Sequence, residues 1–254
     1  MLKSMDINCD MGESFGNWKM GDDEGMMPYI TTANVACGFH ASDPLTMIET
    51  CRKARSHQIS VGAHPGLPDL LGFGRRTMNI TPEDAHAYVV YQVGALQASL
   101  ATQGMRLHHI KPHGAFYSVL KTSAELAEAV AEAIEKLSDQ PMLYWPAPTS
   151  AALPSACKKR GIRVVGEIYP DLHYAADGSL VIQRQKHETD VAFACAQVKR
   201  YVQTGKVEAL DGSLVELDAE SLCIHGDGPN SVEVARAIQR TLQAIGCEIK
   251  PVLQ

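Results

Sequence analysis

The sequence lacks the features that mark several protein classes. In its 254 residues no apolar run approaches the roughly 18 residues of a membrane span, and the N-terminus has no basic region followed by an apolar core, as a secretory signal would. The net charge of −6, without a dense stripe of Lys and Arg, argues against a nucleic-acid partner. We therefore expect a cytoplasmic protein that binds neither membranes nor nucleic acid.

Paired cysteines and standard cofactor motifs are also missing. The seven cysteines form no C-x-x-C pair, and an odd number in a cytosolic protein favours reduced thiols buried in the core. Neither G-x-x-x-x-G-K-[ST] nor G-x-G-x-x-G follows a strand-like run, so a bound nucleotide would be held by loops. No H-E-x-x-H motif occurs, and we predict no tightly bound metal. Histidines and carboxylates at strand ends leave a zinc or manganese hydrolase as an alternative.

Strand-like and helix-like segments alternate along a chain of ordinary globular composition, with 45% hydrophobic and 20% charged residues. The predicted strands are 4–10, 31–37, 59–63, 106–111, 141–146, 162–168 and 221–225. The predicted helices are 43–57, 81–104, 123–137, 188–203 and 231–244. Successive β–α units predict parallel strands with right-handed crossovers, closed into a seven-stranded, TIM-like (β/α) barrel that forms a single domain over residues 1–254. The segment 247–253 is a weaker candidate for an eighth, edge strand.

Three long segments interrupt this alternation. Residues 12–30, 64–80 and 169–190 are polar or rich in glycine and proline, and each follows a predicted strand. Long loops inside a compact domain are more often functional than idle. Because they follow strands, we place them on the rim of the barrel that carries active sites.

Four predicted strands end abruptly in glycine, histidine and other ionisable residues. The endings are Asp10–Glu13, Gly62–Gly66, Lys111–Gly114 and His225–Gly228, and a fifth strand run closes at His40. The carboxyl ends of barrel strands meet at one rim, so these side chains are predicted to converge on one catalytic pocket.

The first strand has one polar face. Asp6, Asn8 and Asp10 share that face by the two-residue period of a strand, which predicts a polar barrel interior, with a solvated edge strand as the alternative. Glu13 follows closely and could pair with Asp10. Close carboxylates push their pKa values apart, which yields one acid and one base.

The fourth strand carries a second polar face, formed by His109, Lys111 and His113. A lysine in a partly desolvated pocket can stabilise an anionic oxygen, whereas a rim lysine would pair with a surface carboxylate. His113 stands at the end of the strand and is the better candidate for proton transfer. His108 and His109 are assigned mainly to structure.

Further candidates lie on the loops of the same rim. His64 and His225 each stand beside glycines at a tight strand exit, and we expect at least two of His64, His113 and His225 to reach the site. Arg75 and Arg76 follow Gly-Phe-Gly, and two guanidinium groups suit a carboxylate or phosphate, although a solvated basic pair is an equal alternative.

In this order, the endings resemble the LamB/YcsF family. The matching segments are Asp6–Glu13, Ala33–His40, Gly62–Gly66 with Gly72–Arg76, Lys111–Gly114 and His225–Asp227. With their spacing they cover essentially the whole chain. The resemblance implies a barrel similar to the glycoside hydrolase/deacetylase superfamily. It also implies one component, the A type, of a 5-oxoprolinase, which opens 5-oxo-L-proline to L-glutamate with ATP and works with B and C subunits.

The implied reaction sets the roles of the residues. A five-membered lactam is nearly unstrained, so phosphorylating its amide oxygen from ATP, a co-substrate expected with Mg²⁺, would couple ring opening to ATP hydrolysis. The site then needs a cation near that oxygen, a base for water and an acid for the ring nitrogen. Lys111 suits the first role, Asp10 or His64 the second, and His113 or Glu13 the third. The residues expected to bind substrate or phosphate are Asn8, Asn34, His40, Arg75, Arg76, Glu167, His225 and Asp227.

The chain departs from the family pattern after the sixth strand. The family reads Glu-x-Phe-Ala-Asp-Arg-x-Tyr where Glu167–Tyr174 has no arginine, and Arg184 is shifted by one position in the segment that follows. Both changes fall on one rim loop, which predicts a change in the lactam that is bound, such as a related lactam, rather than in the reaction type. A stand-alone metal-dependent deacetylase or amidohydrolase on the same barrel is the alternative function, and a homo-oligomer is compatible with the sequence.

Overall fold

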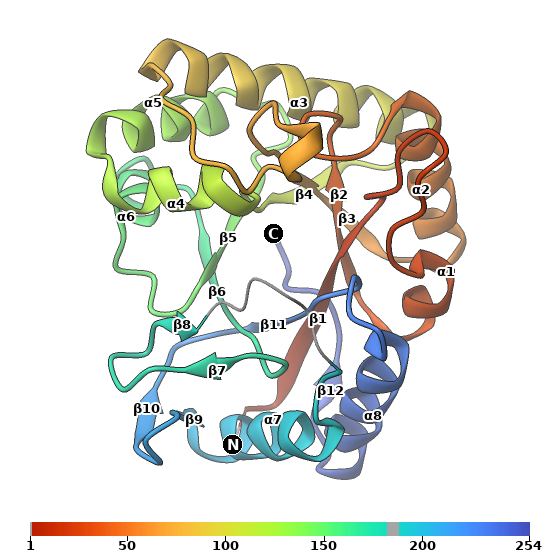
Figure 1. Cartoon of the computed structure of the whole chain (residues 1–254), viewed down its shortest axis with the longest axis vertical. Coiled ribbons are helices and arrows are strands. Elements are labelled where there is room, and N and C mark those ends of the chain that lie inside the picture. Colours follow the sequence, from red (N-terminus) through yellow and green to blue (C-terminus); the bar gives the residue numbers. More distant parts are fainter. Residues whose placement is uncertain (1, 182–187) are drawn as a thin grey trace.

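Seven parallel strands form a closed barrel in the computed structural model, which describes residues 2–181 and 188–254 (Figure 1). The strands follow one another around the barrel in chain order, and the last pairs with the first, with Asp6 opposite Ser221 and Cys9 opposite Ile224. They are β1 (Ser4–Met11), β2 (Thr32–Ala36), β3 (Ser60–His64), β4 (Leu107–Ile110), β5 (Met142–Pro146), β6 (Val164–Ile168) and β11 (Ser221–Ile224). The predicted seven-stranded parallel barrel is therefore confirmed.

Helices surround the barrel on its outer side (Figure 1). The five that the sequence predicts are α2 (Pro44–Ser56), α3 (Pro82–Thr102), α5 (Ala124–Glu135), α7 (Val191–Thr204) and α8 (Ser231–Ala244). Two of them begin at clear capping signals, because Asp43 accepts the N–H groups of Leu45 and Thr46, and Thr81 forms a capping box with Asp84. Within the described ranges, no helix combines the length and apolar character needed to cross a bilayer.

Several short elements were not predicted. They are α1 (Asp23–Met26), the 3-10 turns Met27–Tyr29 and Leu70–Gly72, α4 (Gly114–Thr122), α6 (Ala152–Lys159), the hairpin β7 (His173–Tyr174) with β8 (Leu180–Val181), and the hairpin β9 (Lys206–Glu208) with β10 (Leu214–Glu216). Neither α4 nor α6 has a capping side chain at its start, and the hairpin strands are too short for a period to show. The weak edge strand is real but brief, since β12 (Glu248–Ile249) pairs with β1 outside the barrel. The shifted Arg184 lies outside the described residues.

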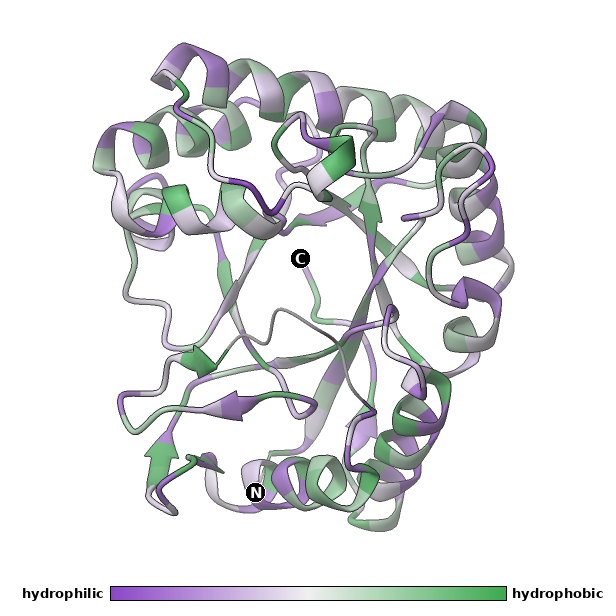
Figure 2. Ribbon diagram, in the orientation of Figure 1, coloured by the Kyte–Doolittle hydropathy of each residue, from purple (hydrophilic) through white to green (hydrophobic). Residues whose placement is uncertain are grey.

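The inner face of β1 is polar and its outer face is apolar, as the sequence predicts. Asp6 and Asn8 are buried and bond to groups of other strands inside the barrel. Ile7 and Cys9 are buried in the hydrophobic core. Figure 2 shows both hydrophobic and hydrophilic residues along β1 and along the outer helices. All seven cysteines are free thiols, six of them buried, in agreement with the expected reduced core cysteines.

Asp6 lies deep in the barrel and is surrounded by hydroxyl groups. Its carboxylate accepts hydrogen bonds from Thr31, Thr32, Tyr144 and Ser221. Burial raises the pKa of Asp6 from 3.8 to about 6, although the four hydroxyls oppose that shift. The folded protein therefore holds this proton more tightly than the unfolded chain does.

We expect Asp6→Asn to alter how stability depends on pH. A raised carboxyl pKa contributes stability below pH 3.8, and this contribution is lost as the pH rises through about 6. Between pH 4 and pH 7 the free energy of unfolding of the variant should therefore gain about 3 kcal/mol relative to the parent. Urea unfolding of both proteins across this range measures the difference, and a difference that does not change with pH would contradict it.

Candidate active site

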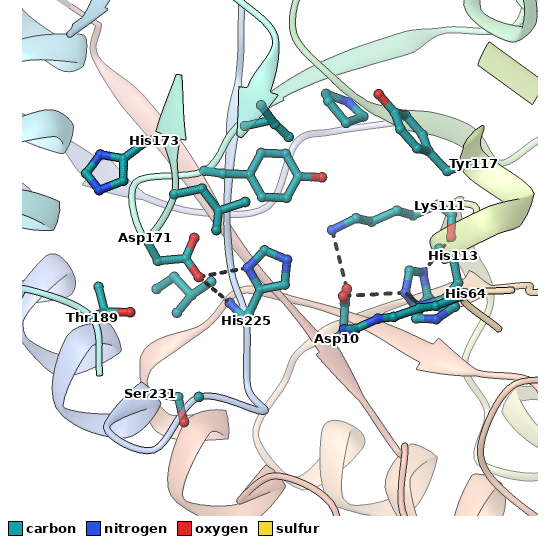
Figure 3. Close-up of a pocket in the computed structure, with 18 of the residues that line it drawn as sticks. Asp10, His64, Lys111, His113, Tyr117, Asp171, His173, Thr189, His225 and Ser231 are labelled. Carbon is teal, nitrogen blue, oxygen red and sulfur yellow. Dashed lines mark hydrogen bonds and ion pairs between the residues drawn. The ribbon is translucent and has the colours of Figure 1, made fainter. Parts of the chain in front are cut away.

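A cavity of about 900 Å³ opens at the carboxyl ends of the strands (Figure 3). Its polar wall includes Asp10, His64, Lys111, His113 and His225, which come from four of the five predicted endings. The structure thus brings all three histidines that were expected to reach the site to one wall. Glu13, from the same ending as Asp10, lies against His113 rather than in the lining.

Lys111 follows β4 and reaches across the barrel interior (Figure 3). Its ammonium nitrogen lies 3.3 Å from Oδ1 of Asp10, 3.4 Å from Oε2 of Glu167 and 3.0 Å from the sulfur of Cys223. Burial by itself would lower the pKa of Lys111, but these neighbours, with Asp10 foremost, raise it well above its usual value. Lys111 is therefore a fixed buried cation rather than a rim lysine with a surface partner.

Buried amides hold this cation in place. Asn8 accepts from Lys111 through Oδ1 at 3.2 Å and donates through Nδ2 to Glu167 at 3.0 Å. Asn34 donates to Asn8 and to Asp10, both at 2.8 Å. His109 is 2.6 Å from Oδ1 of Asn34 and is fully buried below the cavity, which agrees with its assignment to structure. Asn8, Asn34 and Glu167 therefore orient Lys111 from beneath and do not line the cavity.

The carboxyl groups of Asp10 and Glu13 have opposite pKa shifts. Burial alone would raise the pKa of Asp10, but His64 and Lys111 lower it well below its usual value. For Glu13, burial and the charge of Asp10 both raise the pKa well above its usual value. The two groups thus differ in the direction that the sequence predicts, with Asp10 ionised and Glu13 protonated near neutral pH.

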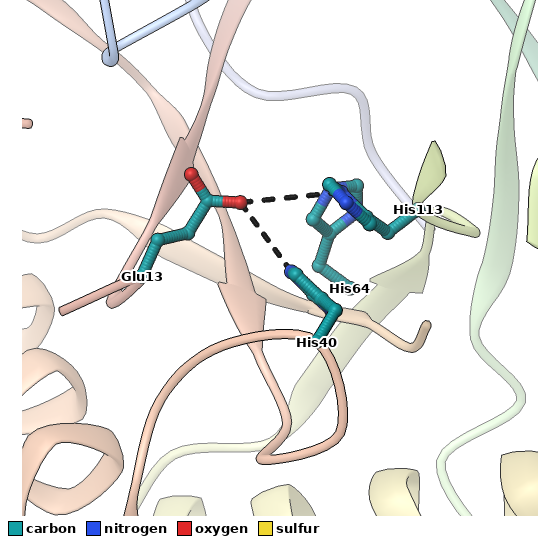
Figure 4. Close-up of side chains that lie close together, drawn as sticks. All are labelled: Glu13, His40, His64 and His113. Atoms are coloured by element: carbon teal, nitrogen blue, oxygen red, sulfur yellow. Dashed lines mark hydrogen bonds and ion pairs between the residues drawn. The ribbon is translucent and has the colours of Figure 1, made fainter. Parts of the chain in front are cut away.

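Three histidines gather around Glu13 (Figure 4). Nε2 of His40 lies 3.4 Å from Oε1 of Glu13, and Nδ1 of His113 lies 4.0 Å from the same oxygen. The rings of His40 and His113 stack with centroids 3.7 Å apart, and His64 meets His113 at a near right angle. Burial, reinforced by His64, lowers the pKa of His113 to about 3, so His113 is neutral and is a poor acid at neutral pH.

Glycines of the second and third loops allow this close packing. A Cβ atom on Gly66 would lie 2.6 Å from Nδ1 of His40. Gly74 has a φ of +62°, and a Cβ there would lie 2.6 Å from Cβ of His40. Both positions need glycine, which explains why the glycine-rich endings accompany the histidines.

On the opposite wall, His225 pairs with Asp171. Nδ1 of His225 lies 2.7 Å from Oδ2 of Asp171, and the same oxygen accepts the backbone N–H of His225 at 3.2 Å. Asp171 was not among the predicted site residues. Its signal was its place three residues after the end of β6, on the loop where the chain departs from the family pattern.

The same loop and strand supply two more residues that sequence reasoning missed. The ring of Tyr169 lies 5.3 Å from the ammonium of Lys111, and its hydroxyl donates to Glu167. Cys223 was assigned to the core, yet its sulfur touches Lys111. Burial raises the pKa of Cys223, so its thiol stays protonated.

The two adjacent arginines take different directions. Arg75 lines the cavity, lies over the ring of Phe73 and is 3.4 Å from a carboxylate oxygen of Asp227. Arg76 pairs with Asp69 and is not among the lining residues. The predicted use of both guanidinium groups at one anion is therefore not supported by this geometry, which leaves Arg75 for that role.

Comparisons with known proteins agree with one another. The model of the LamB/YcsF family matches residues 5–254. A Bordetella bronchiseptica protein, named as the second of two 5-oxoprolinase subunits of the A type, is 50% identical over 253 residues, which are 99% of this chain and 100% of that protein. The 5-oxoprolinase protein of the same type from Bacillus cytotoxicus is 42% identical over 245 residues, 96% of each chain.

A solved structure has the same architecture. The lactam utilization protein of Thermus thermophilus superposes with a TM-score of 0.91 and 41% sequence identity, covering 98% of this chain and 100% of that one. The barrel, its loops and the order of its strands are thus shared along the full length of both proteins.

Proposed function

Because the chain belongs to the LamB/YcsF family, we propose that it is the A-type component of a cytoplasmic 5-oxoprolinase. The enzyme would cleave the lactam amide of 5-oxo-L-proline to L-glutamate and hydrolyse ATP in the same cycle. The names of the relatives designate them as subunits, which supports a multi-subunit enzyme, and we propose partners of the B and C type. Within the structure, the observation that carries the proposal is the buried ammonium of Lys111 in the cavity wall, beside an ionised and a protonated carboxyl group.

Lys111 is proposed to stabilise the lactam oxygen. As that oxygen takes on negative charge or carries a phosphoryl group, a fixed ammonium in a buried site lowers the energy of the charged species more than a solvated one would. Asp10 and Glu167 keep Lys111 protonated and hold it in position. No movement of the cation is then needed during the reaction.

The neighbouring groups are proposed to move protons. Asp10 is ionised and lines the cavity, so it can serve as the base that activates water, with His64 as the second candidate. Glu13 is protonated and is a better acid for the ring nitrogen than the neutral His113. Arg75 is the cavity cation best placed to bind the substrate carboxylate or a phosphate of ATP.

Reconstitution tests the proposed activity. We expect the chain, mixed with B and C subunits from the same source, to release glutamate from 5-oxo-L-proline only when ATP and Mg²⁺ are present. The phosphate released from ATP should equal the glutamate formed. Omitting each component in turn is the control, and a lactam without the carboxylate tests whether the changed loop after β6 accepts a different ring. Glutamate release by this chain alone, without ATP, would contradict the proposal.

A further inference from the structure

The hydrogens on two of the clustered histidines can be assigned from their backbone partners. Nδ1 of His64 lies 2.6 Å from the carbonyl oxygen of Lys111, and Nε2 of His113 lies 2.8 Å from the carbonyl oxygen of Phe73. A carbonyl oxygen can only accept, so each of these ring nitrogens carries the hydrogen. In a neutral imidazole the other nitrogen is then a bare lone pair. Both remaining nitrogens, Nε2 of His64 and Nδ1 of His113, are therefore acceptors.

These two acceptors face each other at 3.0 Å, with their rings at an interplanar angle of 85°. Two lone pairs at hydrogen-bond distance repel unless a positive centre lies between or beside them. Across residues 2–181 and 188–254, neither nitrogen has a hydrogen-bond donor other than this mutual contact. The ammonium of Lys111 is engaged elsewhere, with Asp10 and Cys223.

Two carboxylates complete the ring of donor atoms around this space. Oδ2 of Asp10 lies 3.4 Å from Nε2 of His64, and Oε1 of Glu13 lies 4.0 Å from Nδ1 of His113. Ligand atoms bound at about 2.0–2.2 Å from one metal ion lie about 3–4 Å from one another. The separations of 3.0, 3.4 and 4.0 Å agree with that geometry.

We propose that His64, His113, Glu13 and Asp10 bind one divalent transition-metal ion, through Nε2, Nδ1 and one oxygen of each carboxylate. Two imidazoles with two carboxylates suit zinc or manganese better than magnesium or copper(I). Asp10, His64 and His113 line the cavity, so the ion would face it and could take a water or a substrate oxygen as a further ligand. This replaces the sequence-based expectation of no bound metal. It does not depend on which lactam, if any, is cleaved.

The groups around these four side chains fit a metal centre. Histidine ligands of metals usually donate their other N–H to a carbonyl or carboxylate, as His64 and His113 do here. His40 stacks on His113 with an interplanar angle of 7°, and ring lone pairs lie in the ring plane, so the two parallel rings cannot both aim at one ion. His40 instead donates from Nε2 to Glu13, which leaves its buried Nδ1 as an acceptor without a partner among the described residues.

A second group of donor types is nearby but is already occupied. Asp10, Cys223 and His225 also approach one another closely. The ammonium of Lys111 lies 3.0 Å from the sulfur of Cys223 and 3.3 Å from Asp10, so a positive charge fills that space. The ion is therefore assigned to the His64 side of Asp10.

Metal content of the purified full chain tests the site. The protein is stripped with a chelator, desalted and titrated with ZnCl₂ or MnCl₂, with binding followed by calorimetry and the bound metal counted by mass spectrometry. We expect about one ion per chain, and binding at least about 100-fold weaker in both Glu13→Gln and His113→Gln. His225→Gln changes a histidine of the same cavity outside the proposed donor set and should bind like the parent. Thermal unfolding of the metal-free proteins confirms that each variant is folded.

Two results would overturn the proposal. A folded parent chain that retains no zinc or manganese would mean that the two histidine nitrogens share a proton instead. Equal binding by Glu13→Gln, His113→Gln and His225→Gln, or a thiolate charge-transfer band after Co²⁺ substitution, would place the ion elsewhere. The measurement needs neither substrate nor the B and C proteins, so its outcome is separate from that of the reconstitution assay.

Discussion

Lys111→Met is expected to lower the turnover of the reconstituted enzyme by about 1,000-fold, because it removes the one buried cation proposed to stabilise the lactam oxygen. Methionine has a similar length and can fill the same space. The substitution also leaves the carboxylates of Asp10 and Glu167 without their cation, each of which lies within 3.4 Å of it. We therefore expect a loss of about 3–5 kcal/mol in the free energy of unfolding as well.

A double variant separates these two effects. Adding Glu167→Gln to Lys111→Met removes one of the stranded charges, and the amide can still accept from Tyr169 and from Asn8. Most of the stability should return, as measured by urea unfolding, while glutamate release should remain as low as in the single variant. If turnover recovered together with stability, Lys111 would be a structural residue and not part of the reaction.

The repeating barrel strands were predictable because their signal is local. Each of the seven is a short apolar run bounded by turn residues, and the chain order of the strands is also their order in the barrel. The polar face of β1 was predictable for the same reason, since a two-residue period needs no partner to be read. The helices α4 and α6 lack a capping side chain, and the hairpins β7–β8 and β9–β10 are two or three residues per strand, so their formation depends on contacts that the sequence does not display.

The candidate site was predictable at the level of its rim and not of its pairs. Strand endings place Asp10, His64 and Lys111 together because all parallel strands end on one side. Which side chain faces which depends on barrel curvature and on loop paths. The stacking of His40 on His113 and the contact of Lys111 with Cys223 are therefore products of the tertiary structure.

The arginine pair and the loop after β6 show the same limit. Adjacent residues point in different directions when a loop turns, so Arg75 reaches the cavity while Arg76 pairs with Asp69. Asp171 was passed over because a single aspartate in a polar loop has no distinguishing period or spacing. Only the structure shows that it holds His225 through both the ring and the backbone.

Asn8→Asp tests the polar interior on which the site rests. Nδ2 of Asn8 donates to Glu167 at 3.0 Å, to the hydroxyl of Ser221 at 2.8 Å and to the carbonyl of Leu222 at 3.2 Å. The carboxylate and the carbonyl can only accept, so this orientation of the amide is the one that their chemistry allows. Aspartate would place an oxygen against all three and add a buried negative charge beside Glu167.

We expect this substitution to lower the free energy of unfolding by about 4 kcal/mol at neutral pH, because it leaves a buried charge uncompensated. The loss should shrink in acid, since the introduced carboxyl group, once protonated, would again offer a hydrogen to its neighbours. Asn17→Asp makes the same chemical change at an exposed position and should alter stability by less than about 0.5 kcal/mol. Urea unfolding of the three proteins at several pH values measures these differences. Equal effects at the two positions would mean that Asn8 is not the buried donor that orients Glu167, and the fixed position of Lys111 would then need another cause.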